Sequence, residues 1–444
     1  MGNWRRTERK RNRFQMIPNI LVVGSGGREH VLVWKIHQSP LVKKIYAAPG
    51  NAGIAQLAEC VEVNAEDIDS LRRFAAEQKI DLTVVGPEVP LVNGIVDSFE
   101  AAGLRIFGPT KAAAQLEGSK AFAKDLMARL GVPTASYETF DRVDQAKHFM
   151  VQKKPPFVIK ADGLAAGKGV LITNTHKEAV DVVRQIIEKR RFGNSGKRVV
   201  IEEHLTGDEL SVLLFTDGSS ILPLASSQDH KRAYDGDRGP NTGGMGAYCP
   251  CPFVSNEELN RIVETTARPV IQELNRRGTP YRGLLYLGLM MTPSGPYVLE
   301  YNVRFGDPEA QAVLPRLKTD IVPLMLEVAD GALKTKALEW DTRACIAVVM
   351  ASAGYPGPFE KGHEIEGLDK VNANGVFVFH AGTRKGSSGK VVTDGGRVLA
   401  VSALGESLRE AHERAYRSIK EIAVSGGFYR SDIGKRVLEN MKVG

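Results

Sequence analysis

The sequence has few cysteines and no long apolar run. Four cysteines in 444 residues are too few for a disulfide framework. The one close pair, Cys249 and Cys251, has no second pair to complete a zinc site, so we expect structural thiols in a reducing cytoplasm. No apolar run reaches the roughly 18 residues of a membrane-spanning helix. No apolar segment follows the first basic residues, as it would in a secretory signal. We therefore expect no membrane partner.

The sequence has little net positive charge outside its first residues. The formal net charge is +7, but residues 1–15 hold six basic side chains against Glu8 alone. The remainder is nearly balanced, so we expect no nucleic-acid partner. We predict that residues 1–16 form a disordered basic tail. Met16 directly precedes the first predicted strand and is an alternative start, whereas an organellar targeting peptide is less favoured because the segment lacks serine.

Two standard nucleotide-binding fingerprints are also missing. In the glycine cluster Gly24–His30, Glu29 stands where the dinucleotide fingerprint needs a third glycine. In the second cluster, Gly163–Gly169, Lys168 is not followed by Ser or Thr, so this is not a Walker A loop. A glycine turn that opens a helix can still bind an anion, and a small-residue loop with a lysine can still close over a triphosphate. The alternative for each cluster is a tight turn without a ligand.

The order of apolar segments predicts three regions, which suits a length typical of two to four domains. Residues 17–117 alternate short strands with helices, which is typical of a doubly wound parallel sheet. Residues 118–330 contain longer strands and helices and are predicted to form a central α+β domain. Residues 337–444 are predicted to form a smaller α+β domain. The expected strands and helices are 19–24, 44–47, 82–85, 105–107, 157–160, 199–203, 211–215, 284–291, 297–301, 344–351, 375–381 and 396–403 for strands, and 67–78, 94–102, 119–130, 321–329 and 408–422 for helices.

The segment 299–311 carries the clearest chemical pattern. Glu300 and Asn302 are two positions apart on a predicted strand, so their side chains point to the same face. Two oxygen ligands completed by water and phosphate suit magnesium. Arg304 lies on the same face if the strand continues, where it can pair with a carboxylate or a phosphoryl group. Taken alone, this pattern would more often be an exposed strand face.

Other charged residues gain meaning only together. Lys120 and Lys160 flank the second glycine cluster and could neutralise phosphate oxygens, although each alone is typical of a solvated surface. The acidic turn around Glu202 and Glu209 could hold an adenosine, but acidic turns are common. The segment 228–232, with the glycines of 241–246, could form a substrate floor or a mobile loop.

These motifs, in this order, resemble the phosphoribosylamine–glycine ligase family of the ATP-grasp superfamily. The resemblance covers residues 17–444. Its most specific motif is Arg304–Gln311, which reads RFGDPEAQ. The other matching segments are 24–30, 49–53, 86–88, 163–169, 228–232, 243–246 and 428–434.

The resemblance implies an ADP-forming ligase of purine synthesis that makes glycinamide ribonucleotide from 5-phosphoribosylamine, glycine and ATP through glycyl phosphate. It implies four groups of site residues. The expected catalytic residues are Arg304, Lys120 and Lys160. The expected nucleotide contacts are Lys120, Lys160, Gly167, Lys168, Glu202, Glu203, Leu205 and Glu209. The expected substrate contacts are Gly26, Gly27, Asn51, Glu88, Asp229, Lys231 and Arg304, and Glu300 and Asn302 are expected to hold Mg²⁺ or Mn²⁺.

Among these residues, Arg304 is expected to orient the glycine carboxylate or the acyl phosphate. Asn51 and Glu88 are expected on the phosphoribosylamine side, and the loop 163–169 is the expected lid. No enzyme nucleophile is needed, which agrees with the lack of a Ser/His/Asp arrangement. We expect a cytoplasmic, single-function monomer. The alternatives are another ATP-grasp carboxylate–amine ligase, a nicotinamide-dependent dehydrogenase, and a nucleic-acid binder that uses the basic tail.

Overall fold

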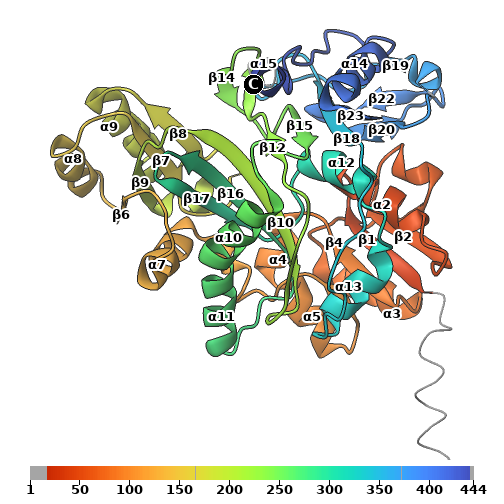
Figure 1. Ribbon diagram of the computed structural model, residues 1–444, viewed down its shortest axis with the longest axis horizontal. Coiled ribbons are helices and arrows are strands. Elements are labelled where there is room, and N and C mark those ends of the chain that lie inside the picture. Colours follow the sequence, from red (N-terminus) through yellow and green to blue (C-terminus); the bar gives the residue numbers. More distant parts are fainter. Residues whose placement is uncertain (1–17, 166, 372, 441–444) are drawn as a thin grey trace, which may run out of the picture.

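The computed structural model describes residues 18–440 except 166 and 372 (Figure 1). The predicted basic tail, including Met16, lies outside these residues. Within them, no helix is both long and apolar enough to cross a membrane.

The N-terminal part is a five-stranded parallel sheet in the order β3-β2-β1-β4-β5. Its central strand β1 is almost fully buried, as a strand covered on both faces should be. This confirms the predicted doubly wound sheet. The elements are β1 (Asn19–Gly24), α2 (Gly27–His37), β2 (Lys44–Pro49), β3 (Glu59–Cys60), α3 (Ile68–Glu77), β4 (Leu82–Val85), α4 (Glu88–Asn93), α5 (Ile95–Ala101) and β5 (Ile106–Phe107).

The central part contains two four-stranded sheets. One has the order β6-β9-β7-β8, and helices α8 and α9 pack against each other and against its strands. This outer lobe has its own hydrophobic core, and it projects to the left in Figure 1. The elements of the lobe and its approach are α6 (Gln115–Gly118), α7 (Lys120–Leu130), β6 (Tyr137–Phe140), α8 (Val143–Val151), β7 (Phe157–Ala161), β8 (Val170–Thr173), α9 (His176–Ile187) and β9 (Val199–Glu203).

The second central sheet has the order β11-β10-β16-β17 and lies under the lobe. Its long strands pair antiparallel, with Gly288 opposite Glu300 and Tyr286 opposite Asn302. The elements are β10 (Asp208–Thr216), β11 (Ile221–Pro223), β13 (Arg232–Tyr234), β14 (Arg238–Asn241), α10 (Asn256–Thr266), α11 (Arg268–Arg276), β16 (Gly283–Thr292), β17 (Gly295–Asn302), α12 (Glu309–Val313) and α13 (Ile321–Ala329).

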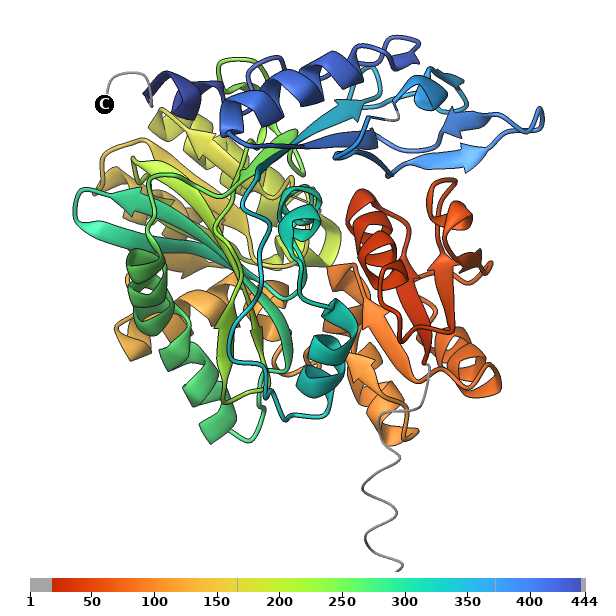
Figure 2. The same cartoon turned by 45° about the vertical axis from the view of Figure 1, so that its right-hand side comes forward.

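The C-terminal part is a layer across the top of the molecule in Figure 2. Its sheet, β12-β15-β18-β23-β20, includes two strands from the segment that the sequence places in the central block. The C-terminal part therefore shares a sheet with the central segment that contains Asp229. The elements are β12 (Gln228–Asp229), β15 (Gly246–Cys249), β18 (Ala344–Ala351), β19 (Ile365–Glu366), β20 (Val376–His380), β21 (Thr383–Lys385), β22 (Val391–Thr393), β23 (Arg397–Gly405), α14 (Leu408–Ile419), β24 (Ala423–Val424) and α15 (Lys435–Asn440).

One hydrophobic core joins all three parts. It contains Val22 of β1, Phe215 of β10, Met325 of α13 and Phe379 of β20, all nearly inaccessible to solvent. The outer lobe does not contribute to this core. The three parts thus share one core, and the outer lobe is built around a separate one.

Candidate active site

A cavity of about 1050 Å³ lies between the outer lobe, β17 and the C-terminal layer. It is lined by backbone and side chains from all three parts of the chain. Most of the predicted site residues line it together: Glu88, Lys120, Lys160, Gly167, Glu202, Glu203, Leu205, Glu209, Asp229, Lys231, Glu300, Asn302 and Arg304. Residues up to 216 positions apart in sequence therefore meet at one site.

Four predicted residues do not line this cavity: Gly26, Gly27, Asn51 and Lys168. The Asn51 side chain is buried, and its amide is used within the chain. Its nitrogen donates to the carbonyls of Ser25 and His380 at 2.8 and 2.9 Å, and its oxygen accepts from the amides of Gly53 and Ile54. The Asn51 side chain therefore shapes the N-terminal loop, and its expected substrate contact stays a prediction.

The side chain of Glu29 occupies the first glycine turn. The Glu29 carboxylate accepts a hydrogen bond from the Gly26 amide at 2.5 Å and pairs with Arg28 at 2.6 Å. A Cβ at Gly27 would lie 2.5 Å from the Gln311 amide nitrogen, so glycine is needed there for close packing. The Glu29 side chain therefore caps the start of α2, and the expected substrate contact of Gly26 and Gly27 stays a prediction.

The second glycine loop reaches the C-terminal part of the chain. A Cβ at Gly167 would lie 3.3 Å from the Thr242 carbonyl, and Lys168 donates to the Pro356 carbonyl at 2.9 Å. Gly167 has a positive φ of 73°, which favours glycine. The loop therefore lies at the rim of the cavity, where the sequence predicted a lid, but the Lys168 amine points away to Pro356.

Two lysines and one carboxylate form a buried triad at the lobe. Glu202 pairs with Lys160 and with Lys124, each at 2.9 Å, and all three side chains are nearly inaccessible. Burial, and then repulsion from Lys160, lower the pKa of Lys124 to about 8. The Glu202 side chain thus holds Lys160 in place, and the expected adenine contact, which involves the backbone of the strand from Glu202, stays a prediction. The backbone of the following residues, up to Leu205, still faces the cavity.

Glu300 is surrounded by lysines. Burial would raise the pKa of the Glu300 carboxyl, but Lys231, Lys160 and Lys120 outweigh burial and lower it to about 2. The carboxyl is therefore ionised at neutral pH. Its Oε1 lies 3.9 Å from the Lys231 amine and 3.4 Å from the Asn302 amide nitrogen.

The Glu300–Asn302 pair fits a hard divalent cation. Both side chains lie on β17 and face the cavity, and each offers an oxygen. Among the described residues no group of three or more His, Cys, Asp and Glu side chains could enclose a metal ion. Two protein oxygens completed by phosphate and water are the usual coordination of Mg²⁺ beside a nucleotide, and a closed protein cage is not.

Arg304 lies beyond the end of β17 between two carboxylates. Its guanidinium is 3.2 Å from Glu88 and 3.0 Å from Glu117. Burial opposes the charge of Arg304, but Glu117 and Glu88 keep its pKa above the ordinary value. Burial would raise the pKa of Glu88, yet Arg304 and Arg28 lower it to about 2. Glu88 therefore lies beside Arg304 in the cavity lining, and its expected contact with phosphoribosylamine stays a prediction.

Glu117 is a buried acid that the sequence did not identify. Its Oε2 accepts a hydrogen bond from the Val303 amide at 2.6 Å while Oε1 pairs with Arg304. Burial raises the pKa of the Glu117 carboxyl from 4.5 to about 7, despite the attraction of Arg304. The Glu117 side chain thus fixes the backbone at Val303, between the Glu300–Asn302 pair and Arg304.

Replacing Glu117 with glutamine should flatten part of the dependence of stability on pH. A carboxyl with a raised folded-state pKa adds stability that is complete below about pH 4.5 and is lost as the pH rises through about 7. The unfolding free energy of the wild type, relative to the Glu117→Gln variant, should fall by on the order of 3 kcal/mol across that window. Urea unfolding at several pH values measures this difference. A constant difference from pH 4 to 8 would contradict the assignment.

The cavity contains further paired charges near Glu300. Lys231 lies 3.2 Å from Glu209, and Glu209, Asp229 and Glu300 together hold the pKa of Lys231 well above its ordinary value although burial opposes this. Burial raises the pKa of Asp229 well above its usual range, with Lys231 acting in the opposite direction. Lys120 donates to the Gly163 carbonyl at 3.2 Å, and its pKa is lowered, chiefly by burial.

Several lining residues were missed by sequence reasoning. Asp307 pairs with Arg397 at 3.0 Å, and Glu309 accepts from Ser211 at 3.2 Å. Asp307 and Glu309 lie inside the motif 304–311, which was the signal that could have identified them. Arg397 lies in no motif. The other unpredicted charged residues of the lining include Arg28, Glu117, Lys124, Arg430 and Asp432.

Three family models match the chain one after another. The N domain of phosphoribosylglycinamide synthetase matches residues 18–117, its ATP-grasp (A) domain matches 118–310, and its C domain matches 345–436. The chain is 51% identical over 414 residues to phosphoribosylamine–glycine ligase of Caldanaerobacter subterraneus subsp. tengcongensis. That alignment covers 93% of this chain and 99% of the relative.

Solved structures agree with these matches. The crystal structure of phosphoribosylamine–glycine ligase from Thermotoga maritima superposes with a TM-score of 0.82 at 33% identity, over 94% of this chain and all of that one. The biotin carboxylase domain of Hydrogenobacter thermophilus 2-oxoglutarate carboxylase, solved with MgADP and bicarbonate, has a TM-score of 0.74 at 17% identity. It covers 93% of this chain and 91% of that one, a likeness of fold alone.

Proposed function

Because the chain belongs to the phosphoribosylamine–glycine ligase family, we propose that it joins glycine to 5-phosphoribosylamine with hydrolysis of ATP to ADP. The product is glycinamide ribonucleotide, an intermediate of purine synthesis. The single observation that carries this proposal is the convergence of Lys120, Lys160, Glu300, Asn302 and Arg304 on one cavity. Phosphate-neutralising cations, a metal pair and a carboxylate-binding arginine are the groups that activation of a carboxylate by ATP needs.

ATP binds between the outer lobe and β17 in this proposal. The backbone from Glu203 to Leu205 meets the adenine, and the Glu209 carboxylate faces the ribose. Lys120 and Lys160 meet the phosphates. The support is that all of these line the same cavity, and that the buried Glu202 carboxylate fixes the Lys160 amine at 2.9 Å.

Glu300 and Asn302 hold a magnesium ion beside the phosphates. When bound, the ion neutralises charge on the transferring phosphoryl group. The ionised Glu300 carboxylate, held so by three lysines, supports this role. Mn²⁺ would suit the same oxygen ligands, and substitution of one ion for the other in the assay decides between them.

The reaction has two steps, phosphoryl transfer to glycine and acyl transfer to the amine. A carboxylate oxygen of glycine attacks the γ-phosphorus of ATP, the bond to the β-phosphate oxygen breaks, and glycyl phosphate and ADP form. The amine of phosphoribosylamine then attacks the acyl carbon, phosphate leaves, and the amine loses a proton. Arg304 orients the carboxylate, and Glu88 and Glu117 fix the arginine. Positioning and charge stabilisation do the catalytic work, so no enzyme nucleophile is required.

The acyl phosphate must be kept from water until the amine arrives. The outer lobe has a core separate from the main body, and the loop that contains Gly167 lies at the cavity rim. We assign closure to this lobe and loop. Asp229 and Lys231 stand opposite, on the segment that continues into β13.

ADP release by the purified protein tests the reaction. With ATP, Mg²⁺, glycine and freshly generated phosphoribosylamine, we expect release that stops when either glycine or phosphoribosylamine is omitted. Release that ignores glycine but follows another acid would instead support a different carboxylate–amine ligase. Gel filtration at assay concentration tests the expected monomer, and localisation by fractionation tests the expected cytoplasmic site.

A further inference from the structure

The segment Phe428–Gly434 lines the cavity but has no part in the proposed chemistry. Its Arg430 side chain is almost completely buried, although arginine is usually exposed. The guanidinium makes a two-point contact with Asp432, at 2.7 and 2.9 Å. Its third nitrogen donates to Asp237 at 2.8 Å. Such a buried, fully paired arginine indicates a fixed geometry.

The contacts of this segment converge on the hairpin of β13 and β14. Asp432 accepts from the Gly236 amide at 2.8 Å, and the Ser431 amide donates to Asp235 at 2.8 Å. The Phe428 ring packs against Tyr234 with centroids 5.8 Å apart. Hydrogen bonds, an ion pair and one aromatic contact therefore hold the hairpin against the C-terminal segment.

Two of its hydrogen bonds lie on either side of Lys231. The Arg430 guanidinium donates to the carbonyl of Arg232 at 3.1 Å. The Gly434 amide donates to the His230 ring nitrogen Nε2 at 3.2 Å. Lys231 itself points to Glu209 and Glu300, at 3.2 and 3.9 Å. The residues before and after Lys231 are thus held from the C-terminal part of the chain.

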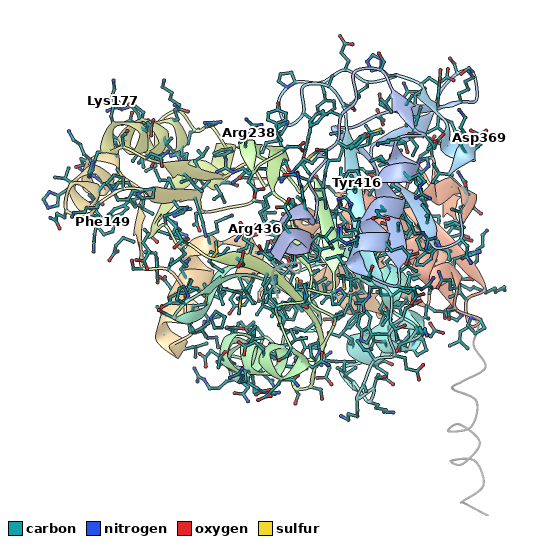
Figure 3. The ribbon with its side chains drawn as sticks, turned by 45° about the horizontal axis from the view of Figure 1, so that its top comes forward. Phe149, Lys177, Arg238, Asp369, Tyr416 and Arg436 are labelled. Atoms are coloured by element: carbon teal, nitrogen blue, oxygen red, sulfur yellow. The ribbon has the colours of Figure 1, made fainter. Side chains whose placement is uncertain are left out.

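Helix α14 anchors the segment from behind. The Tyr416 hydroxyl donates to the Arg430 carbonyl at 2.7 Å and accepts from the Ile433 amide at 3.0 Å. Figure 3 shows Tyr416 on α14 beside the short helix that carries Arg436. A rigid helix, a buried arginine and the hairpin therefore form one continuous set of contacts that ends at Lys231.

We propose that Arg430 is a positioning residue that holds Lys231 between Glu209 and Glu300. The inference rests on the proposed function, because Lys231 lies beside Glu209 and Glu300, which that function assigns to the ribose and to the metal ion of the nucleotide. Arg430 does not touch the substrates in this account. It fixes the backbone at Arg232, and the hairpin then fixes the lysine amine.

Lysine cannot replace this arginine. An ammonium group has no planar fork, so it cannot keep both contacts to Asp432 together with those to Asp237 and Arg232. In Arg430→Lys we expect kcat/KM for MgATP to fall about tenfold or more, because small displacements of a charged group are costly at an active site. The dissociation constant of MgADP, measured by calorimetry, should rise in parallel.

A double-mutant cycle separates this role from a general structural one. The four proteins are the wild type, Arg430→Lys, Lys231→Met and the double variant. If Arg430 acts through Lys231, adding Arg430→Lys to Lys231→Met should change kcat/KM and MgADP affinity by no more than about twofold. The proposal would be overturned if the two substitutions lowered kcat/KM by independent factors that multiply in the double variant. It would also be overturned if Arg430→Lys had the kcat/KM and MgADP affinity of the wild type.

Arg343 offers a matched control. It also makes a two-point contact with an aspartate two positions away, Asp341, but does not line the cavity. Arg343→Lys should leave both readouts unchanged. If Arg430→Lys does not fold, the cycle is run with Asp237→Asn, which spares the Asp432 contact and should again be non-additive with Lys231→Met. A wild type that releases no ADP with glycine and phosphoribosylamine would defeat the proposed function, whereas the MgADP cycle would still decide the role of Arg430.

Discussion

Replacing Glu300 with glutamine is expected to lower the rate of ADP formation more than a hundredfold. Glutamine keeps the shape but removes the charge that three lysines hold at neutral pH. Charge stabilisation by a bound metal ion is worth several kcal/mol, and each 1.4 kcal/mol is about tenfold in rate. The measurement is kcat with saturating glycine and phosphoribosylamine across a range of Mg²⁺ concentrations.

A binding readout accompanies this test. Calorimetric titration of ADP with and without Mg²⁺ should show that magnesium strengthens nucleotide binding in the wild type but much less in Glu300→Gln. Glu264→Gln is the control: it alters a surface ion pair between Glu264 of α10 and Arg268 of α11, and it should match the wild type. If Glu300→Gln kept the wild-type magnesium dependence, Glu300 would not be a metal ligand.

Replacing Arg304 with lysine is expected to lower kcat/KM for glycine about a hundredfold or more. Lysine keeps a positive charge but cannot contact Glu88, Glu117 and a substrate carboxylate at once. The loss of one oriented charged contact in the transition state costs about 3 kcal/mol. Steady-state kinetics with glycine varied and ATP saturating measure the effect.

The surface pair of Arg276 with Glu273 provides the matched control. It is also a two-point contact, at 2.7 and 2.8 Å, but lies on the exposed face of α11. Arg276→Lys should not change the kinetics. If Arg304→Lys raised only the KM for ATP and left the glycine kinetics unaltered, Arg304 would contact the nucleotide and not glycine.

Sequence patterns predicted helices and strands well where the apolar residues of a segment show which of its faces is buried. The strands 82–85, 199–203 and 344–351 and the helix 321–329 have the expected bounds. These segments are continuous apolar runs or periodic helices with clear ends. The shared face of Glu300 and Asn302 followed from the two-residue period of a strand, and the family resemblance is confirmed by the three domain models.

Contacts between distant segments could not be predicted. Glu117 and Arg304 are 187 positions apart, and Arg430 meets Asp237 across 193, so no local period relates them. The burial of Glu202 between Lys124 and Lys160 could not be read from the strand pattern around it, because both lysines come from other elements. Likewise, only the folded chain places four partners around the Asn51 amide.

The most direct test of the account follows the oxygen atoms of glycine. Glycine with ¹⁸O in both carboxylate positions is supplied with ATP, Mg²⁺ and phosphoribosylamine, and the released phosphate is analysed by mass spectrometry. If the carboxylate attacks the γ-phosphorus, one ¹⁸O must appear in each phosphate formed, and the other must remain in the amide product. Phosphate without ¹⁸O would contradict activation of glycine as an acyl phosphate, whatever the rate of ADP release.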